Sequence, residues 1–265
     1  MSTQNTAGRN ADQYLERAGA RLRWRLCGKG PAVVLLHGWA LDLTYWDPVA
    51  ALLSEEFSVL RFDRCGFGLS QGQPDIHRNV PDLAALLDAA AIEHAVLVGM
   101  SQGARLAIHF ALQLPARVRG IVLDGAPALE AESELPLVQY RRRLDAQGIP
   151  ALQADILRHP LMQLVTDDAA SRSLLANCVA RYRALDLNQQ VTRRRKPELG
   201  DIAAPTLILN GSLDSPARRA AGRALQAAIP DAQQIELAGA GHLAALDDPA
   251  AYAASVAAFV DDLAP

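Results

Sequence analysis

Ser101 lies at the centre of the pentapeptide Gly-Met-Ser-Gln-Gly, which occupies residues 99–103. A short apolar run at residues 95–98 precedes it and predicts a buried strand. Leucine or phenylalanine then recurs every fourth residue from 106 to 114, which predicts a helix. A serine between strand and helix, with glycine two residues away on either side, is the pattern of a nucleophile elbow. The turn is so tight that a side chain at either glycine would collide with packed backbone, and it presents the serine hydroxyl above the sheet edge.

A serine hydroxyl is a poor nucleophile at neutral pH and needs a base within hydrogen-bond reach. His242 is the candidate, because it follows the last predicted strand in a Gly-Ala-Gly loop whose small residues let an imidazole reach over the sheet edge. His37 also follows a predicted strand, but its place before Gly38 suits a residue that braces a loop. We interpret the remaining histidines as structural or surface residues: His77, His94, His109 and His159.

The base in turn needs an acid that fixes its tautomer and stabilises the imidazolium. Asp214 follows the strand predicted at residues 206–210 through Gly-Ser-Leu, which places it at the carboxyl end of that strand. Asp124 also follows a strand and is the competing candidate. We favour Asp214, because its loop gives it reach, whereas Asp124 is expected to cap the turn at 125–127. The chain order of Ser101, Asp214 and His242 is then one of the known orders of a catalytic triad.

Acyl transfer also requires donors for the oxyanion that forms at the attacked carbonyl. The backbone N–H of Gln102 is one candidate, because it directly follows the nucleophile and opens a helix, where the helix dipole favours negative charge. The second is expected from the loop after the first parallel strand, as the backbone N–H of Trp39. Because both donors are main-chain groups, the side chains of these two residues are free to serve the substrate.

Composition and charge argue against some classes of binding partner and indicate a location. The chain has 265 residues, half of them hydrophobic, and a net charge of −3, so it lacks the basic character of a nucleic-acid-binding domain. It contains no apolar run long enough to span a membrane and no signal-peptide pattern near Met1. An odd count of three distant cysteines predicts free thiols in a reducing compartment, and hence a cytoplasmic location. The oligomeric state is left open.

The order of predicted elements indicates an α/β fold. Strands and helices alternate up to residue 127, and the strand pattern returns at 206–210 and 234–237, which predicts a mostly parallel sheet flanked by helices. Between 128 and 199 only helical patterns occur, at 137–147, 151–158 and 169–183. We therefore predict a core formed by 13–127 and 200–265, a helical cap at 128–199 and a disordered tail at 1–12.

The predicted cap is mildly basic, with eleven lysines and arginines against nine acidic residues. Most of these charges are expected to form a solvated surface. The alternative is that one or two cap arginines point inward and hold an acidic substrate. The glycine-rich turn at 63–70 lacks the third glycine and the helix start of a phosphate cradle, so we expect no nucleotide site there.

Five motifs together resemble the α/β-hydrolase superfamily, in its esterase, lactonase and cofactor-free haloperoxidase branch. They lie at residues 37–39, 63–70, 99–103, 211–214 and 239–242. The resemblance implies an eight-stranded sheet, a helical cap, no metal and no organic cofactor. Haloalkane dehalogenases and epoxide hydrolases resemble the same pattern but carry aspartate at the elbow, so Ser101 argues against both. Cys65 departs from the family, which usually has arginine or proline there, and no second base is evident that would make it a nucleophile.

These observations predict a serine hydrolase that cleaves a small carboxylic ester or lactone through an acyl-enzyme. Its catalytic residues would be Ser101, Asp214 and His242, and its oxyanion donors the N–H groups of Trp39 and Gln102; the substrate-binding residues are unknown. The alternatives on the same triad are an enol-lactonase of an acidic substrate, a carbon–carbon bond hydrolase, and a perhydrolase or acyltransferase. An alternative of another class is a non-catalytic receptor that keeps the fold and binds a small ligand.

Overall fold

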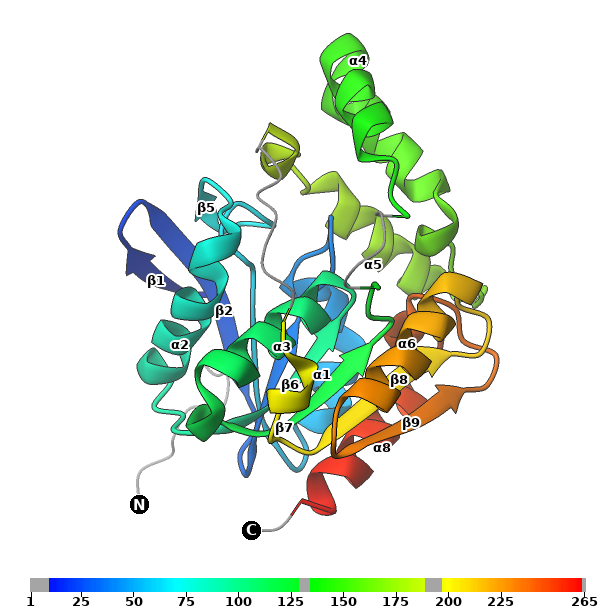
Figure 1. Ribbon diagram of the computed structural model, residues 1–265. Coiled ribbons are helices and arrows are strands. Elements are labelled where there is room, and N and C mark those ends of the chain that lie inside the picture. Colours follow the sequence, from blue (N-terminus) through cyan, green and yellow to red (C-terminus); the bar gives the residue numbers. More distant parts are fainter. Residues whose placement is uncertain (1–9, 129–133, 189–196, 264–265) are drawn as a thin grey trace.

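A computed structural model describes residues 10–128, 134–188 and 197–263 of the chain. One sheet runs through the molecule, and helices cover both of its faces (Figure 1). Within the described residues the sheet has nine strands, eight of them in the order β1-β2-β4-β3-β6-β7-β8-β9, with β5 paired to β2. The strands from β4 to β9 along this path are parallel, whereas β1, β2 and β5 are antiparallel to their neighbours. The predicted α/β-hydrolase fold is confirmed, and the sheet has one strand more than the eight expected, because the two-residue β5 also pairs with β2.

The strands have the following bounds: β1 Gln13–Arg17, β2 Ala20–Cys27, β3 Ala32–Leu36, β4 Ser58–Phe62, β5 Gln71–Gly72, β6 Ala95–Met100, β7 Val118–Asp124, β8 Thr206–Gly211 and β9 Ala232–Leu237. The central strands are short apolar runs, as a parallel sheet covered on both faces requires. Alternate residues of β3 contribute to two separate cores: Val33 and Leu35 to one, Val34 and Leu36 to the other.

The α-helices are α1 Asp47–Leu53, α2 Asn79–Ala89, α3 Gln102–Gln113, α4 Leu137–Arg158, α5 Ala169–Ala180, α6 Pro216–Ala228, α7 Ala244–Asp247 and α8 Pro249–Asp261. Helices α2, α3 and α6 cover one face of the sheet, and α1 and α8 cover the other (Figure 1). Helix α7 ends at Asp247 and α8 begins separately, because Asp248 accepts the N–H of Ala251 and Pro249 occupies the first turn of α8.

Helices α4 and α5 belong to the predicted cap and lie beyond the carboxyl ends of the parallel strands (Figure 1). Two helices were predicted at 137–147 and 151–158, and the structure joins them across a kink at Gly148, which has φ 76°. No strand occurs in the described part of 128–199, namely residues 134–188 and 197–199. No helix among the described residues is long and apolar enough to cross a membrane.

Residues 1–9 of the predicted tail lie outside the described residues. Asp12 contacts the core, because its carboxylate pairs with Arg23 and Arg25 of β2. Arginines alternate with apolar residues at 21–26, which predicts a half-buried strand with its arginines on the polar face, but Arg23 is only 2 % exposed. Its burial is explained by partners on both sides: besides Asp12, its guanidinium donates to Asp63 at 3.2 Å.

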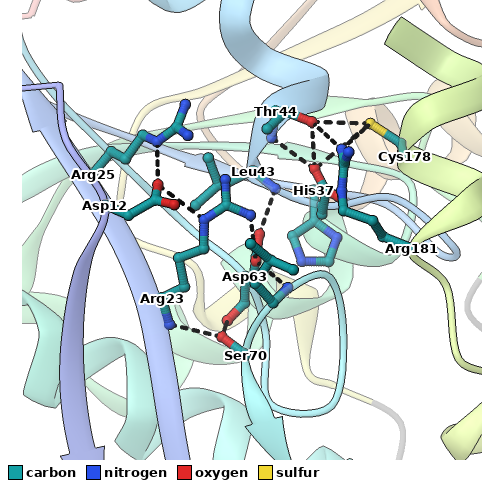
Figure 2. A network of polar contacts seen from close by, with 12 residues as sticks. Asp12, Arg23, Arg25, His37, Leu43, Thr44, Asp63, Ser70, Cys178 and Arg181 are labelled. Atoms are coloured by element: carbon teal, nitrogen blue, oxygen red, sulfur yellow. Dashed lines mark hydrogen bonds and ion pairs between the residues drawn. The ribbon is translucent and has the colours of Figure 1, made fainter.

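A buried polar network connects the core to the cap (Figure 2). Asp63, which follows β4, accepts the backbone N–H of Leu43 at 2.7 Å and the Arg23 guanidinium. Burial and the nearby charge of Asp42 raise the pKa of Asp63 to about 6. Asp42 is fully buried and receives Arg181, which follows α5 of the cap, at 2.5 Å. Burial alone would raise the pKa of Asp42, but its bonds to Arg181 and Thr44 hold that pKa below the ordinary value.

Replacing Arg181 by methionine is expected to destabilise the protein by about 2 kcal/mol, because it leaves the buried Asp42 carboxylate without its cation. The loss is smaller than for a fully buried pair, since Arg181 is 29 % exposed and Asp42 keeps two bonds from Thr44. Urea unfolding measures the change. Arg158→Met is the matched control in the cap, because Arg158 is 73 % exposed and pairs with Asp155 at the surface. Equal decreases in the free energy of unfolding for Arg181→Met and Arg158→Met would contradict the claim that the buried carboxylate of Asp42 needs Arg181.

Candidate active site

Ser101 stands at the turn from β6 into α3 with φ 53° and ψ −109°, a conformation that few non-glycine residues adopt. Its N–H donates to the carbonyl of Asp124 at 2.8 Å, which fixes the turn against β7. A Cβ at Gly103 would lie 2.0 Å from the carbonyl oxygen of Leu36, and one at Gly99 would lie 2.4 Å from the Gly103 backbone. Both glycines are therefore required by close backbone approach, in agreement with the elbow predicted from the sequence.

His242 and Asp214 meet at the same edge of the sheet. Nδ1 of His242 lies 3.0 Å from Oδ2 of Asp214, and the two side chains are 5 % and 0 % exposed. Asp214 comes from the loop after β8, and His242 from the loop after β9. The latter loop is fixed by Asp247, whose Oδ2 accepts the N–H of Gly241 at 2.8 Å. Because a carboxylate accepts at Nδ1, this nitrogen carries the proton and Nε2 is left as the basic atom.

Gly125 lies against the His242 ring and is linked to Ser101 through Arg218. A Cβ at this residue would lie 2.9 Å from both Cε1 and Nδ1 of His242, so the ring packs directly against the Gly125 backbone. The carbonyl of Gly125 accepts Nη1 of Arg218 at 2.9 Å, and the same Nη1 lies 3.3 Å from Oγ of Ser101. Among the described residues, Arg218 is the hydrogen-bond partner recorded for the Ser101 hydroxyl, and no bond joins that hydroxyl to His242.

Arg218 is a site residue that the sequence analysis missed. It lies in the first turn of α6, four residues after Asp214, and its side chain is 5 % exposed. Its Nε donates to Glu134, whose other oxygen accepts the hydroxyl of Ser215 at 2.7 Å. Its position in the sequence could have indicated this place, because the helix that follows the loop of Asp214 begins at the sheet edge where Ser101 lies.

Asp124 is not the partner of His242. Its Oδ2 accepts the hydroxyl of Tyr252 at 3.2 Å, and its Oδ1 has no partner among the described residues. The expectation that its side chain caps the turn at 125–127 is wrong, because the carboxyl group instead bonds to α8. Complete burial, together with the charge of Asp214, raises the pKa of Asp124 well above its ordinary value.

The two candidate oxyanion donors are the backbone N–H groups of Trp39 and Gln102. Among the described residues, neither group donates a hydrogen bond. The Trp39 side chain does not face an open site. Its Nε1 donates to Asp186 at 2.8 Å, and its ring stacks on Tyr140 of α4 at 5.7 Å. Asp186 also accepts the hydroxyl of Tyr182 at 2.6 Å. The Trp39 indole therefore joins the loop after β3 to the cap.

His37 braces the loop after β3, as predicted. Its Nε2 accepts the backbone N–H of Arg64 at 3.0 Å, so its proton is on Nδ1, which donates to the carbonyl of Gly38 at 2.8 Å. Burial, helped by the charge of Arg64, lowers the pKa of His37 to about 3, which keeps the ring neutral. A neutral ring with both nitrogens bonded has a structural role.

The cap closes over this site. Ser101 is 7 % exposed and His242 6 %. Two surface hollows, of about 320 and 310 Å³, lie at the opposite edge of the sheet, where residues such as Thr206 and Ala32 begin their strands. Of the cap arginines considered for an acidic substrate, Arg181 is bound by Asp42 and Arg183 by the carbonyl of Ser70. Residues 193–196 of the same set lie outside the described residues.

The cysteines and the grouping of acidic residues are further candidates for reactive sites within the described residues. All three cysteines are free and buried. Burial raises the pKa of the Cys65 thiol, which donates to the carbonyls of Gln71 and Gln73, so it is not poised as a nucleophile. Across the part of the chain that the structure describes, no three His, Cys, Asp or Glu side chains are grouped as a metal site would require.

The model of the alpha/beta hydrolase fold family matches residues 31–249. The chain belongs to this family. Among curated relatives, the pimeloyl-[acyl-carrier protein] methyl ester esterase of Edwardsiella ictaluri is 26 % identical over 91 % of this chain and 97 % of its own. The enzyme of the same name from Pectobacterium atrosepticum is 29 % identical over 91 % and 98 %. Among solved structures, the enol-lactonase of Burkholderia xenovorans LB400 superposes with a TM-score of 0.82, at 26 % identity over 94 % of this chain and all of its own.

Gly125→Ala is expected to lower kcat for a chromogenic ester by about 10²-fold, because the added methyl group displaces the His242 ring. The φ of 50° at this residue adds local strain. Steady-state kinetics with p-nitrophenyl acetate measures the effect. Gly148→Ala is the control, since Gly148 also has positive φ but lies in the cap helix with no atom closer than 3.9 Å to the added carbon. Wild-type activity in Gly125→Ala would contradict the placement of the imidazole.

Proposed function

We propose that this protein is a serine hydrolase that cleaves small carboxylic esters or lactones through an acyl-enzyme on Ser101. The observation that carries the proposal is the buried bond between His242 and Asp214 at the edge of the sheet where the strained elbow presents Ser101. Membership of the alpha/beta hydrolase fold family supports it, as do the names of the esterase and lactonase relatives. A cytoplasmic location and a small-molecule substrate without a nucleic-acid partner are part of the same proposal.

The reaction follows from the groups at the site. Nε2 of His242 takes the proton of Ser101 as Oγ attacks the substrate carbonyl, and Asp214 stabilises the imidazolium that results. The N–H groups of Trp39 and Gln102 bind the tetrahedral oxyanion. His242 then gives its proton to the leaving alcohol, and the acyl-enzyme forms. Water, deprotonated by the same imidazole, releases the acid and restores the serine.

For attack to occur, the Ser101 hydroxyl must turn to His242. Arg218 does not compete for the proton, because a guanidinium only donates. When Nη1 of Arg218 donates to Oγ, the hydroxyl hydrogen of Ser101 remains available to the imidazole. A cation beside Oγ also favours the negative charge that develops there during attack.

Ser101→Ala is expected to lower kcat/KM for p-nitrophenyl butyrate by about 10⁴- to 10⁶-fold, since no other group supplies the acyl acceptor. Ser255→Ala is the matched control, because its half-buried hydroxyl bonds to the carbonyl of Ala251 within α8 and has no part in the site. Far-ultraviolet circular dichroism checks that both variants are folded. Full esterase activity of folded Ser101→Ala would refute the proposed nucleophile.

A second candidate substrate is an ester or lactone that carries a carboxylate near the scissile bond. The observation that favours it is Arg218, a buried cation 3.3 Å from the nucleophile. Its carboxylate partner, Glu134, precedes the first cap helix and is 29 % exposed. If Glu134 moves with the cap, a substrate carboxylate can take its place between Arg218 and Ser215. In this form the acidic-substrate alternative rests on an arginine of the core.

Arg218→Gln is expected to reduce kcat/KM for the monomethyl ester of a dicarboxylic acid at least about tenfold more than for a neutral methyl ester of equal length, because only the former loses an ion pair. Arg223→Gln, an exposed position on the same helix, is the control and should leave the ratio unchanged. The ratio corrects for any general damage to the site. If the ratio of the two kcat/KM values is unchanged in Arg218→Gln, esters and lactones that carry a carboxylate are excluded as the preferred substrates.

A further inference from the structure

Arg64 touches both halves of the proposed oxyanion site and has no part in the triad. It follows β4 in the turn at 63–70, and it is 6 % exposed. Its Nη2 donates to the carbonyl of Gly38 at 3.0 Å, and its Nη1 donates to Oε1 of Gln102 at 3.2 Å. One guanidinium thus bridges the loop after β3 and the residue that follows the nucleophile.

The bond to Gly38 determines where the N–H of Trp39 points. The carbonyl of Gly38 and the N–H of Trp39 belong to one planar trans peptide group, so they point in opposite directions. That carbonyl accepts two donors, Nδ1 of His37 at 2.8 Å and Nη2 of Arg64, which together occupy both of its lone pairs. The peptide plane is therefore fixed, and the Trp39 N–H is held on the side away from Arg64.

The same peptide lies against the elbow. A Cβ at Gly38 would be 2.5 Å from the sulfur of Met100, the residue that precedes Ser101. The second bond of Arg64 reaches the residue on the other side of the nucleophile, Gln102. The guanidinium consequently ties the loop and the first turn of α3 to each other, and sets the spacing between their two free N–H groups.

Arg64 keeps its positive charge in this position. Burial lowers its pKa to about 10, with Asp186 acting in the opposite direction, so it is protonated at neutral pH. Its guanidinium lies 4.4 Å from the centre of the Phe67 ring, a contact that favours the buried cation. A charged guanidinium forms stronger hydrogen bonds to the Gly38 carbonyl and to Gln102 than a neutral donor would.

We propose that Arg64 is a positioning residue of this enzyme, which aligns the N–H groups of Trp39 and Gln102 on the oxyanion by bridging the Gly38 carbonyl and the Gln102 side chain. The proposal rests on the proposed hydrolase function. It predicts that the loss of Arg64 weakens binding of the tetrahedral state and leaves binding of the ground-state ester nearly unchanged.

The test variant is Arg64→Met. Two measurements are made on it: kcat and KM for p-nitrophenyl butyrate, and the inhibition constant of an aliphatic trifluoromethyl ketone. This ketone forms a tetrahedral adduct with the serine. We expect kcat to fall by about 10²-fold, as for the loss of one oxyanion donor, while KM changes less than about threefold. The inhibition constant should rise by a factor similar to the fall in kcat/KM. Arg61→Met is the matched control, because Arg61 is equally buried but pairs with Asp47 away from the site.

Arg64→Lys is the second variant, which keeps a cation but replaces the planar fork of the guanidinium by one compact ammonium group, and it is expected to retain more activity than Arg64→Met. If Arg64→Met does not fold, the comparison of Arg64→Lys with Arg61→Lys replaces it. Equal inhibitor affinity and kcat in the Arg64 and Arg61 variants would overturn the proposal. Failure of the parent protein to hydrolyse esters or bind the ketone would instead refute the proposed function.

Discussion

The bond between His242 and Asp214 is the interaction on which the site depends. It joins two loops that leave neighbouring parallel strands, and both side chains are almost completely buried. Burial of an unpaired carboxylate would be costly, so the structure holds Asp214 with the imidazole and with the backbone N–H of Ser215. In return the carboxylate fixes the tautomer that a general base requires. Gly125, which has no side chain, leaves room for the His242 ring, and Arg218 places a cation at the same edge of the sheet.

The cap and the core are joined by charged and aromatic contacts of the loops around the site. Arg181 binds the buried Asp42, and Trp39 binds Asp186 while its ring stacks on Tyr140. The loop that supplies a proposed oxyanion donor is thus held from above by the cap and from below by Arg64 and His37. A rigid loop of this kind suits an oxyanion site, because donors that are already oriented need no rearrangement as charge develops.

Much of the fold could be predicted from local pattern. The apolar runs at β3, β6 and β8 are strands because both faces of a parallel sheet are covered, and the spacing in α3 marks a helix with one buried face. The elbow could be predicted because close backbone approach demands glycine at residues 99 and 103. The candidate serine and histidine could be found because each lies in a short motif that contains glycine.

The residues that were missed act through contacts between distant segments. Arg64 and Arg218 look like ordinary charged residues of a turn and a helix, and their roles appear only where the strand order brings them to the elbow. Arg23 likewise follows an alternating pattern that predicts exposure, yet Asp63 and Asp12 enclose it. Asp124 was misjudged because sequence shows that it follows a strand but not that Tyr252 of α8 reaches its carboxyl group.

The most direct measurement is the rate at which a fluorophosphonate labels the protein, with the modified residue identified by peptide mass spectrometry, in the parent and in Asp214→Asn. We expect a single label on Ser101 and a reaction on the order of 10³- to 10⁴-fold slower in Asp214→Asn, because the amide no longer holds the imidazole in its basic tautomer. Labelling at another residue, or an equal rate in the two proteins, would contradict the claim that His242, held by Asp214, activates Ser101.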